Sequence, residues 1–244
     1  MKYFCNPIDV NYRYQFNQDP RKGGALQICR EAADPSLILF KGRYYIFASM
    51  TLGVWVSDDL VNWENHRLPE KLPLYDYAPD VRVLGEWVYF CASNRDRSCD
   101  RWRTKDILNG PYEKIEGSFP YWDPNLFADD DGRVYFCASN REHNCDRWRT
   151  KDILNGPYER IEGSFSYWDP NLFSDDDGRV YFYWGCSNQT PIYGVELDPD
   201  TMEPIGIRYF IRVKTINTSF ERFLLRLNQV WIYGYKSKEN GEIL

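Results

Sequence analysis

Residues 88–135 of this chain recur almost unchanged at 134–181. The two stretches agree at 42 of 48 aligned positions and differ at 96, 97, 98, 114, 120 and 128 and their counterparts 46 residues later. A period of about 40 to 50 residues is typical of propeller blades, Kelch-like units and some helical solenoids. The duplication therefore requires a fold built from units that lie beside copies of themselves.

Four short segments rich in aromatic and β-branched residues make up the repeated unit: PNLFADD, RVYFCAS, CDRWRTKD and YEKIEG. The sequences DDG, NRDRS and LNGP separate them, so the unit is predicted to consist of strands joined by turns. No stretch of ten or more residues in it has an apolar period of 3.6, which excludes helical repeats. Four strands per repeat indicate one blade of a β-propeller.

The same pattern extends along most of the chain and predicts an all-β fold, a single β-propeller domain with four complete four-stranded blades and a partial fifth. The first blade is expected to have an inner strand at 35–40, strands at 43–49 and 53–57, and an edge around Trp63. We place the blades at about 31–70, 77–117, 121–163 and 167–206, and the partial blade at 207–244.

The charge balance and hydropathy exclude several classes of partner. The chain has 30 Lys and Arg against 36 Asp and Glu, a net charge of -6, and no polybasic run. We therefore expect no nucleic-acid partner and no binding to a membrane. The first 20 residues lack the apolar core of a signal peptide, so a cytoplasmic protein is expected. The sequence does not indicate an oligomeric state.

The sequence also predicts no metal site and no cofactor. The seven cysteines lack C-x-x-C spacing, and the two histidines are isolated. The DDDG sequences at 129–132 and 175–178 lack the alternating Asp of a calcium loop and predict hairpin turns. Cys91 and Cys99, like their copies, could face each other across a hairpin. Free thiols in a reducing compartment are the prediction.

An acidic residue adjoins a proline at the start of each predicted blade. In a propeller the first strand of every blade lines the central channel, so equivalent residues meet at one mouth of that channel. Carboxylates gathered there would push each other's pKa values apart, as acid–base catalysis requires. The alternative is that each Asp only turns the chain; recurrence in four blades favours a shared site. The pairs are Asp34-Pro35, Pro79-Asp80, Asp123-Pro124 and Asp169-Pro170.

Three segments resemble the first three blades of glycoside hydrolase family 43: ADPSLILFKGRYYIFAS, YAPDVRVLGEWVYF and WDPNLFSDDDGRVYFYWGCSNQTPIYGVELD. The resemblance covers residues 30–206 and implies a five-bladed propeller that acts on β-xylosides or α-L-arabinofuranosides with inversion. It implies that Asp34 is the general base and that Asp80 shapes the substrate pocket. The Asp that orients the acid and tunes its pKa is matched by Asp169 through the residues after it and by Asp123 through the residues before it.

The family's general acid is a Glu in a Glu-Gly-Pro-like motif, and the sequence has no such motif. Glu221 in SFERF is the nearest candidate. The extra blade is a second departure, because it places Asp34 and Asp169 one blade further apart than in the family. A truncated, shuffled or misassembled reading frame would account for both departures. Trp122, Trp168 and Trp184 are candidates to bind a sugar, or else they pack between blades.

The predicted function is hydrolysis of O-glycosidic bonds in pentose-containing oligosaccharides, as in xylan degradation, by an inverting mechanism with two carboxyl groups. The missing acid motif predicts that this activity is impaired. Two alternatives stay open: a propeller that binds carbohydrate without cleaving it, and an incomplete fold with no function. The expected partner is an oligosaccharide in each case but the last.

Overall fold

The computed structural model of the chain describes residues 10, 16–18, 26–28, 33–49, 51, 53–69, 72, 78–93, 99–119, 122–129, 131–185 and 191–211. Two short strands, β1 (Phe16–Gln18) and β2 (Leu26–Ile28), pair with each other. The other strands in these ranges form four sheets of four strands each. The described part of the chain has no helix, and hence none that could cross a membrane.

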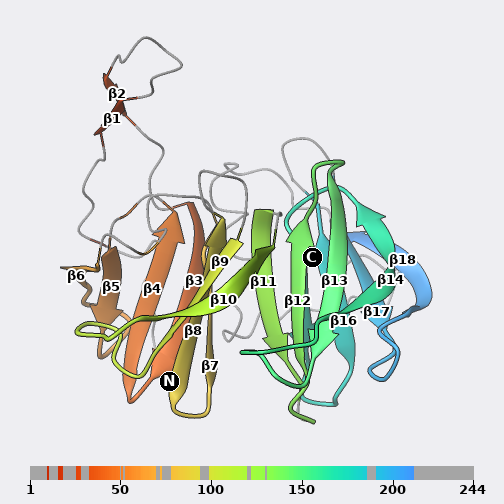
Figure 1. Ribbon diagram of the computed structural model, residues 1–244. Helices are drawn as coiled ribbons and strands as arrows, with labels where there is room; N and C mark the ends of the chain where they lie inside the picture. The colour runs from red at the N-terminus through yellow and green to blue at the C-terminus, as the bar shows by residue number, and fades with distance from the viewer. Residues whose placement is uncertain are drawn as a thin grey trace.

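Each sheet is an antiparallel meander that follows the order of the chain, and we call the sheets blades 1 to 4 (Figure 1). Blade 1 contains β3 (Ala33–Phe40), β4 (Arg43–Ser49), β5 (Gly53–Ser57) and β6 (Glu64–Arg67). Blade 2 contains β7 (Asp80–Leu84), β8 (Trp87–Ser93), β9 (Cys99–Thr104) and β10 (Glu113–Phe119). Blade 3 contains β11 (Trp122–Ala128), β12 (Val134–Ser139), β13 (Asn144–Thr150) and β14 (Glu159–Ser166). Blade 4 contains β15 (Asn171–Ser174), β16 (Val180–Trp184), β17 (Ile192–Leu197) and β18 (Pro204–Ile211).

The predicted all-β propeller with four complete blades is confirmed. β18 extends to Ile211, so residues 207–211 belong to the outer strand of blade 4 and not to a further blade. The rest of the partial blade that the sequence predicts at 207–244 lies outside the described residues.

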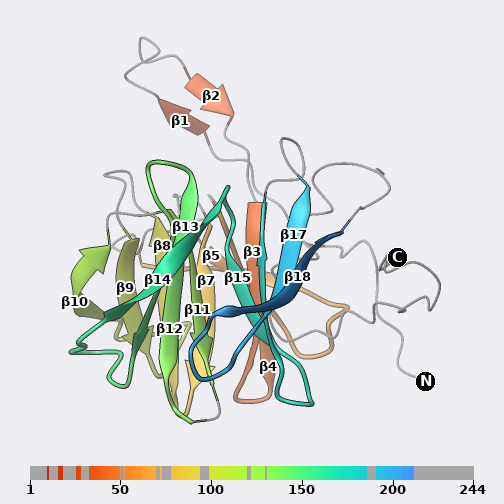
Figure 2. The ribbon, with the colours of Figure 1, turned by 90° about the vertical axis from the view of Figure 1, so that its right-hand side faces the viewer.

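The first strand of each blade is the inner one. β3 contacts β7, β7 contacts β11 and β11 contacts β15, and Figure 2 shows blade 4 beside blade 3. Large apolar side chains fill the space between neighbouring sheets: Phe47 and Phe90 from blades 1 and 2 lie 5.6 Å apart between ring centroids. Burying such a side chain stabilises the fold by about 1.5–3 kcal/mol. The cores therefore lie between blades, which is why a blade needs neighbours.

The two copies of the duplicated sequence fold alike. One comprises β8 to β11 and the other β12 to β15, and each contains a buried arginine in its second strand. Arg101 Nη2 donates to the Glu116 carbonyl at 2.8 Å, and Arg147 Nη2 donates to the Glu162 carbonyl at 3.1 Å. Each copy thus supplies the three outer strands of one blade and the inner strand of the next, and is not an insertion in a loop.

These two arginines also join neighbouring blades. Arg101 Nη1 donates to the carbonyl of Ile153 in blade 3 at 3.3 Å, and Arg147 Nη1 donates to the carbonyl of Met202 in blade 4 at 2.5 Å. Burial lowers the pKa of Arg147, but the value of an arginine lies so high that the side chain stays charged. Each duplicated blade therefore carries its own connection to the next one.

Candidate active site at the ends of the inner strands

Each inner strand starts with a left-handed residue directly before a proline. The φ angle is 50° at Asp34, 61° at Ala78, 48° at Asp123 and 58° at Asp169. Proline restricts the preceding residue to extended conformations, and a left-handed backbone costs a residue other than glycine about 1–2 kcal/mol. Strained positions of this kind persist only where neighbouring groups hold them, and they cluster at functional sites.

Hydrogen bonds between the inner strands place these four residues at the same end of the propeller. Two positions after the left-handed residue of blades 1, 2 and 3, a polar side chain reaches the backbone of the next inner strand and accepts a hydrogen bond from its N–H. The bonds therefore align the four strands at equivalent heights. They join Ser36 to Val81 at 3.1 Å, Asp80 to Leu126 at 2.5 Å and Asn125 to Leu172 at 2.9 Å.

Serines at the ends of second strands hold the left-handed backbone. Ser49 Oγ accepts from the N–H of Ala78 at 2.6 Å, and Ser93 Oγ accepts from the N–H of Asp123 at 3.1 Å. Ser139 Oγ donates to Asp123 Oδ2 at 3.5 Å. All three serines are buried. The sequence signal for them is the Ala-Ser that ends the second strand of blades 1, 2 and 3, a pattern that the predicted site left out.

Asp80 does not occupy the position expected for it. The position of blade 2 that corresponds to Asp34 is Ala78, and Asp80 corresponds to Ser36. Its carboxylate is buried, accepts from Leu126 N–H and lies 3.4 Å from Nε of Arg82. The predicted ring of four equivalent carboxylates is wrong in blade 2, because the acidic residue follows the proline there and faces the neighbouring strand. Ala78 also shows that the left-handed backbone before the proline can form without a carboxylate at that position.

The carboxylates of Asp123 and Asp169 lie near one buried thiol. Burial is the main reason that the pKa of Cys145 is raised, and the negative charges of Asp169 and Asp123 add to the shift. Asp123 acts in the same direction on Cys99. Both aspartates are half-buried, whereas only 6% of the Asp34 surface is exposed. Asp34, Asp123 and Asp169 therefore lie at the same end of the inner strands, and carboxyl groups are the side chains that glycoside hydrolysis uses to activate water.

The three tryptophans proposed to contact a sugar differ in exposure. Trp122 and Trp168 are half-buried next to Asp123 and Asp169. Trp184 is 2% exposed and stacks on Phe182, with ring centroids 5.5 Å apart. Its ring also lies 4.6 Å from that of Phe165 in blade 3, so core packing between blades 3 and 4 replaces the proposed sugar contact of Trp184.

Glu221, the candidate acid, lies outside the described residues. Within them, no group of three or more His, Cys, Asp or Glu side chains could hold a metal ion. The four cysteines there, Cys91, Cys99, Cys137 and Cys145, are buried thiols that form no disulfide.

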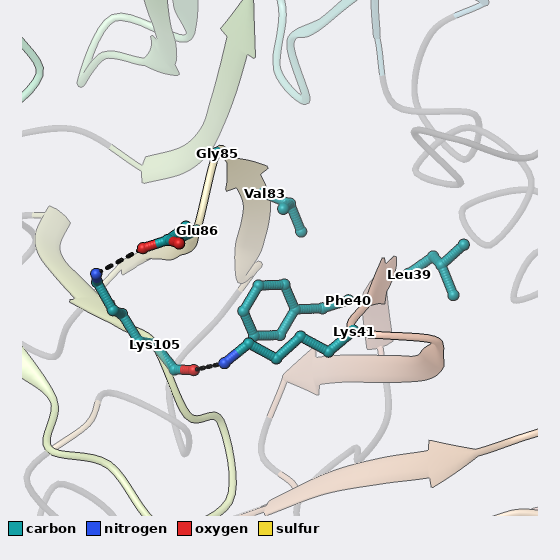
Figure 3. Close-up of a pocket in the computed structure, with 7 residues that line it drawn as sticks. All are labelled: Leu39, Phe40, Lys41, Val83, Gly85, Glu86 and Lys105. Carbon is teal, nitrogen blue, oxygen red and sulfur yellow. Dashed lines mark hydrogen bonds and ion pairs between the residues drawn. The ribbon is translucent and has the colours of Figure 1, made fainter.

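A pocket at the opposite end of the inner strands has a different character. The turns at 39–41 and 85–86 and Lys105 line it (Figure 3). Lys41 Nζ donates to the Lys105 carbonyl, and Lys105 Nζ pairs with Glu86, both at 2.8 Å. The first bond joins blades 1 and 2, and the second lies within blade 2, so the one carboxylate of the pocket is already paired with a lysine. The arrangement does not provide a second carboxyl group for acid–base chemistry.

Comparison with known proteins agrees with this fold. The family model described as "Glycosyl hydrolases family 43" matches residues 28–159, more than half of the chain. None of the curated proteins compared with the chain matches its sequence.

Solved structures of several glycoside hydrolases are similar. The exo-β-1,3-galactanase from Phanerochaete chrysosporium is 16% identical with a TM-score of 0.57, over 75% of this chain and 50% of that one. The Bacteroides ovatus protein described as xyloglucan PUL GH43B is 17% identical with a TM-score of 0.56, over 78% of this chain and 42% of that one. An exo-1,5-α-L-arabinanase from a bovine ruminal metagenomic library is 15% identical with a TM-score of 0.50, over 74% and 78%. The chain spans about half or less of the length of the first two.

Proposed function

Because the chain belongs to glycosyl hydrolases family 43, we propose that it hydrolyses O-glycosidic bonds in pentose-containing oligosaccharides, either β-xylosides or α-L-arabinofuranosides. The observation that carries this proposal is the repeated left-handed residue before proline, which is an aspartate in blades 1, 3 and 4. The fold does not require a carboxylate there, since Ala78 has the same conformation. Three strained aspartates at one end of a channel are best explained by chemistry.

In the proposed mechanism Asp34 is the general base. Its carboxylate takes a proton from a water molecule, and the oxygen of that water attacks the anomeric carbon. The bond from this carbon to the leaving oxygen breaks, and a carboxylic acid on the opposite face of the sugar protonates that oxygen. Inversion requires about 6.5–9.5 Å between the two carboxyl groups, so that the water fits between them.

Asp123 and Asp169 are proposed to orient this acid and to tune its pKa. Both are left-handed residues directly before a proline, as Asp34 is, and this shared backbone geometry supports a role for each. The acid itself is proposed to follow residue 211, and Glu221 is the candidate. Without a recognisable acid motif, we expect substrates with good leaving groups to react best, since acid assistance contributes about 10²- to 10⁴-fold.

The test is hydrolysis of nitrophenyl β-xyloside and nitrophenyl α-L-arabinofuranoside, whose phenolates can leave unprotonated. We expect slow turnover by the wild type and none by Asp34→Asn. Asp58→Asn is the matched control, because Asp58 is an exposed aspartate at the other end of blade 1, paired with Arg43 at 2.7 Å. Equal turnover by the Asp34 variant and the wild type would refute the proposed base.

The same experiment distinguishes hydrolysis from the alternative that the propeller only binds carbohydrate. If both nitrophenyl glycosides stay intact while xylo- or arabino-oligosaccharides change the tryptophan fluorescence, the propeller binds sugars without cleaving them. Aggregation of the purified chain would favour the incomplete-fold alternative, because an unpaired inner strand exposes a sheet edge.

A further inference from the structure

Aromatic side chains lie beside Asp169 on the surface where blades 3 and 4 meet. Tyr167 is 38% exposed, more than any other Phe, Tyr or Trp whose side chain the structure describes. Its ring stacks on Tyr193 with 7° between the planes and 5.6 Å between the centroids. The neighbouring ring of Trp168 lies 4.5 Å from that of His143, again between centroids.

The backbone that presents these rings is held on both sides. The N–H of Tyr167 donates to the carbonyl of His143 at 2.6 Å, and Cys145 Sγ donates to the carbonyl of Tyr167 at 2.9 Å. The N–H of Gly185 donates to the carbonyl of Trp168 at 2.7 Å. A ligand that stacks on these rings therefore does not need to order the segment, which reduces the entropic cost of binding.

The loop that carries His143 is also fixed. Asn140 Oδ1 accepts from the N–H groups of Glu142 and Asn144 at 2.9 and 3.0 Å, and its side-chain nitrogen donates to buried Asp146 at 3.1 Å. Positions 142, 143 and 144 are three of the six at which the second copy differs from the first. The duplicated blades thus differ most at the loop beside Trp168.

The aromatic surface extends outward from the candidate catalytic site. Asp169 directly follows Trp168 and precedes the inner strand β15, whereas Tyr193 belongs to β17, the third strand of blade 4. A ligand chain that starts at the channel mouth and runs over Trp168 would reach Tyr167 next. Sugar rings present C–H groups on their faces, which pack against aromatic rings.

We propose that Tyr167, stacked on Tyr193, is a distal sugar-binding subsite that holds a further unit of an oligosaccharide whose scissile bond lies at the mouth. The inference rests on the proposed function for the class of ligand. It predicts that the protein prefers oligosaccharides longer than two units. A sugar that covers the exposed face of the Tyr167 ring buries apolar surface, which stabilises the complex by about 25 cal/mol per Å². The resulting gain in affinity, relative to a protein without the ring, is about fivefold.

The experiment measures binding by calorimetry in the Asp34→Asn variant, so that turnover does not interfere. The probes are xylo-oligosaccharides and arabino-oligosaccharides of two to five units. We expect the affinity to rise with length, and we expect Tyr167→Ala to lose about fivefold for the longest probe. Tyr167→Phe keeps the ring and should restore the affinity, which separates stacking from a folding defect.

Tyr181→Ala is the matched control, because Tyr181 is a partly exposed tyrosine of the same blade that lies near the β15–β16 turn, away from Asp169. It should leave the dependence on length unchanged. An affinity that is the same for all lengths, an unchanged affinity in Tyr167→Ala, or no binding of any probe would overturn the subsite. Failure of the proposed function looks different: the Asp34 variant would then cleave nitrophenyl pentosides as the wild type does, whatever the binding result.

Discussion

Replacing Asp80 by alanine should destabilise the propeller without acting through a substrate pocket. The carboxylate accepts from Leu126 N–H at 2.5 Å and lies 3.4 Å from Nε of Arg82. The two side chains are 5% and 11% exposed. Burial lowers the pKa of Arg82, and Asp80 is the group that opposes this shift. Removing Asp80 therefore leaves a buried guanidinium without its nearest negative charge.

The cost of breaking such a buried ion pair is about 3–5 kcal/mol. In a protein of this size this corresponds to a fall in Tm of about 6–20 °C. Ser36 and Asn125 occupy the same position in blades 1 and 3 and form neutral hydrogen bonds to the next strand. Ser36→Ala and Asn125→Ala should each cost about 1–3 kcal/mol, because each leaves one backbone N–H unsatisfied.

Urea unfolding followed by tryptophan fluorescence measures the three free energies on one scale. We expect Asp80→Ala to be the least stable variant. The reasoning is refuted if Asp80→Ala unfolds within about 1 kcal/mol of the wild type and yet loses its affinity for oligosaccharides. That outcome would return Asp80 to the substrate pocket that the family resemblance implies.

Two further predictions concern the serines and the thiols. Ser93→Ala and Ser49→Ala should each lose about 1 kcal/mol of stability, because each variant lacks one hydrogen bond to a left-handed residue. Only Ser93→Ala should also lower kcat/KM on nitrophenyl pentosides, since Ser93 bonds to Asp123 whereas Ser49 bonds to Ala78. Equal losses of activity in the two variants would contradict this prediction. Burial raises the pKa of Cys137 from 9.0 to about 12, so the neutral thiol's contribution to stability is complete below pH 9 and is lost as pH rises toward 12, by about 1.4 kcal/mol at pH 10. Urea titrations of the wild type and Cys137→Ala at pH 8 and pH 10 test this. An equal pH dependence of the unfolding free energy in both proteins would show that this thiol does not contribute.

The blades could be predicted from the sequence because the duplication shows the length and content of one unit. In blade 1 the expected strands at 43–49 and 53–57 are the observed β4 and β5. Alternation of apolar residues between Gly and Asp turns is a local signal, and each hairpin depends only on its own turn. The assignment of these strands therefore did not require knowledge of the contacts between blades.

The site was harder to predict because it depends on register between blades. The sequence shows that Asp80 adjoins a proline. When the blades are aligned on this proline, Asp80 corresponds to Ser36, and Ala78 takes the left-handed position that Asp34 has in blade 1. Trp184 illustrates a second difficulty. Sugar pockets and the cores between blades both use tryptophan, and the burial of Trp184 among Phe165, Phe182 and Tyr193 depends on how blade 3 packs against blade 4.

The configuration of the first product tests most directly the claim that Asp34 activates water at the channel mouth. Proton NMR of a reaction with nitrophenyl β-xyloside, recorded before the released sugar mutarotates, distinguishes the two anomers. Direct attack by water on the face opposite the leaving group predicts that α-xylose appears first. Initial formation of β-xylose would show a covalent glycosyl intermediate and would contradict the role proposed for Asp34.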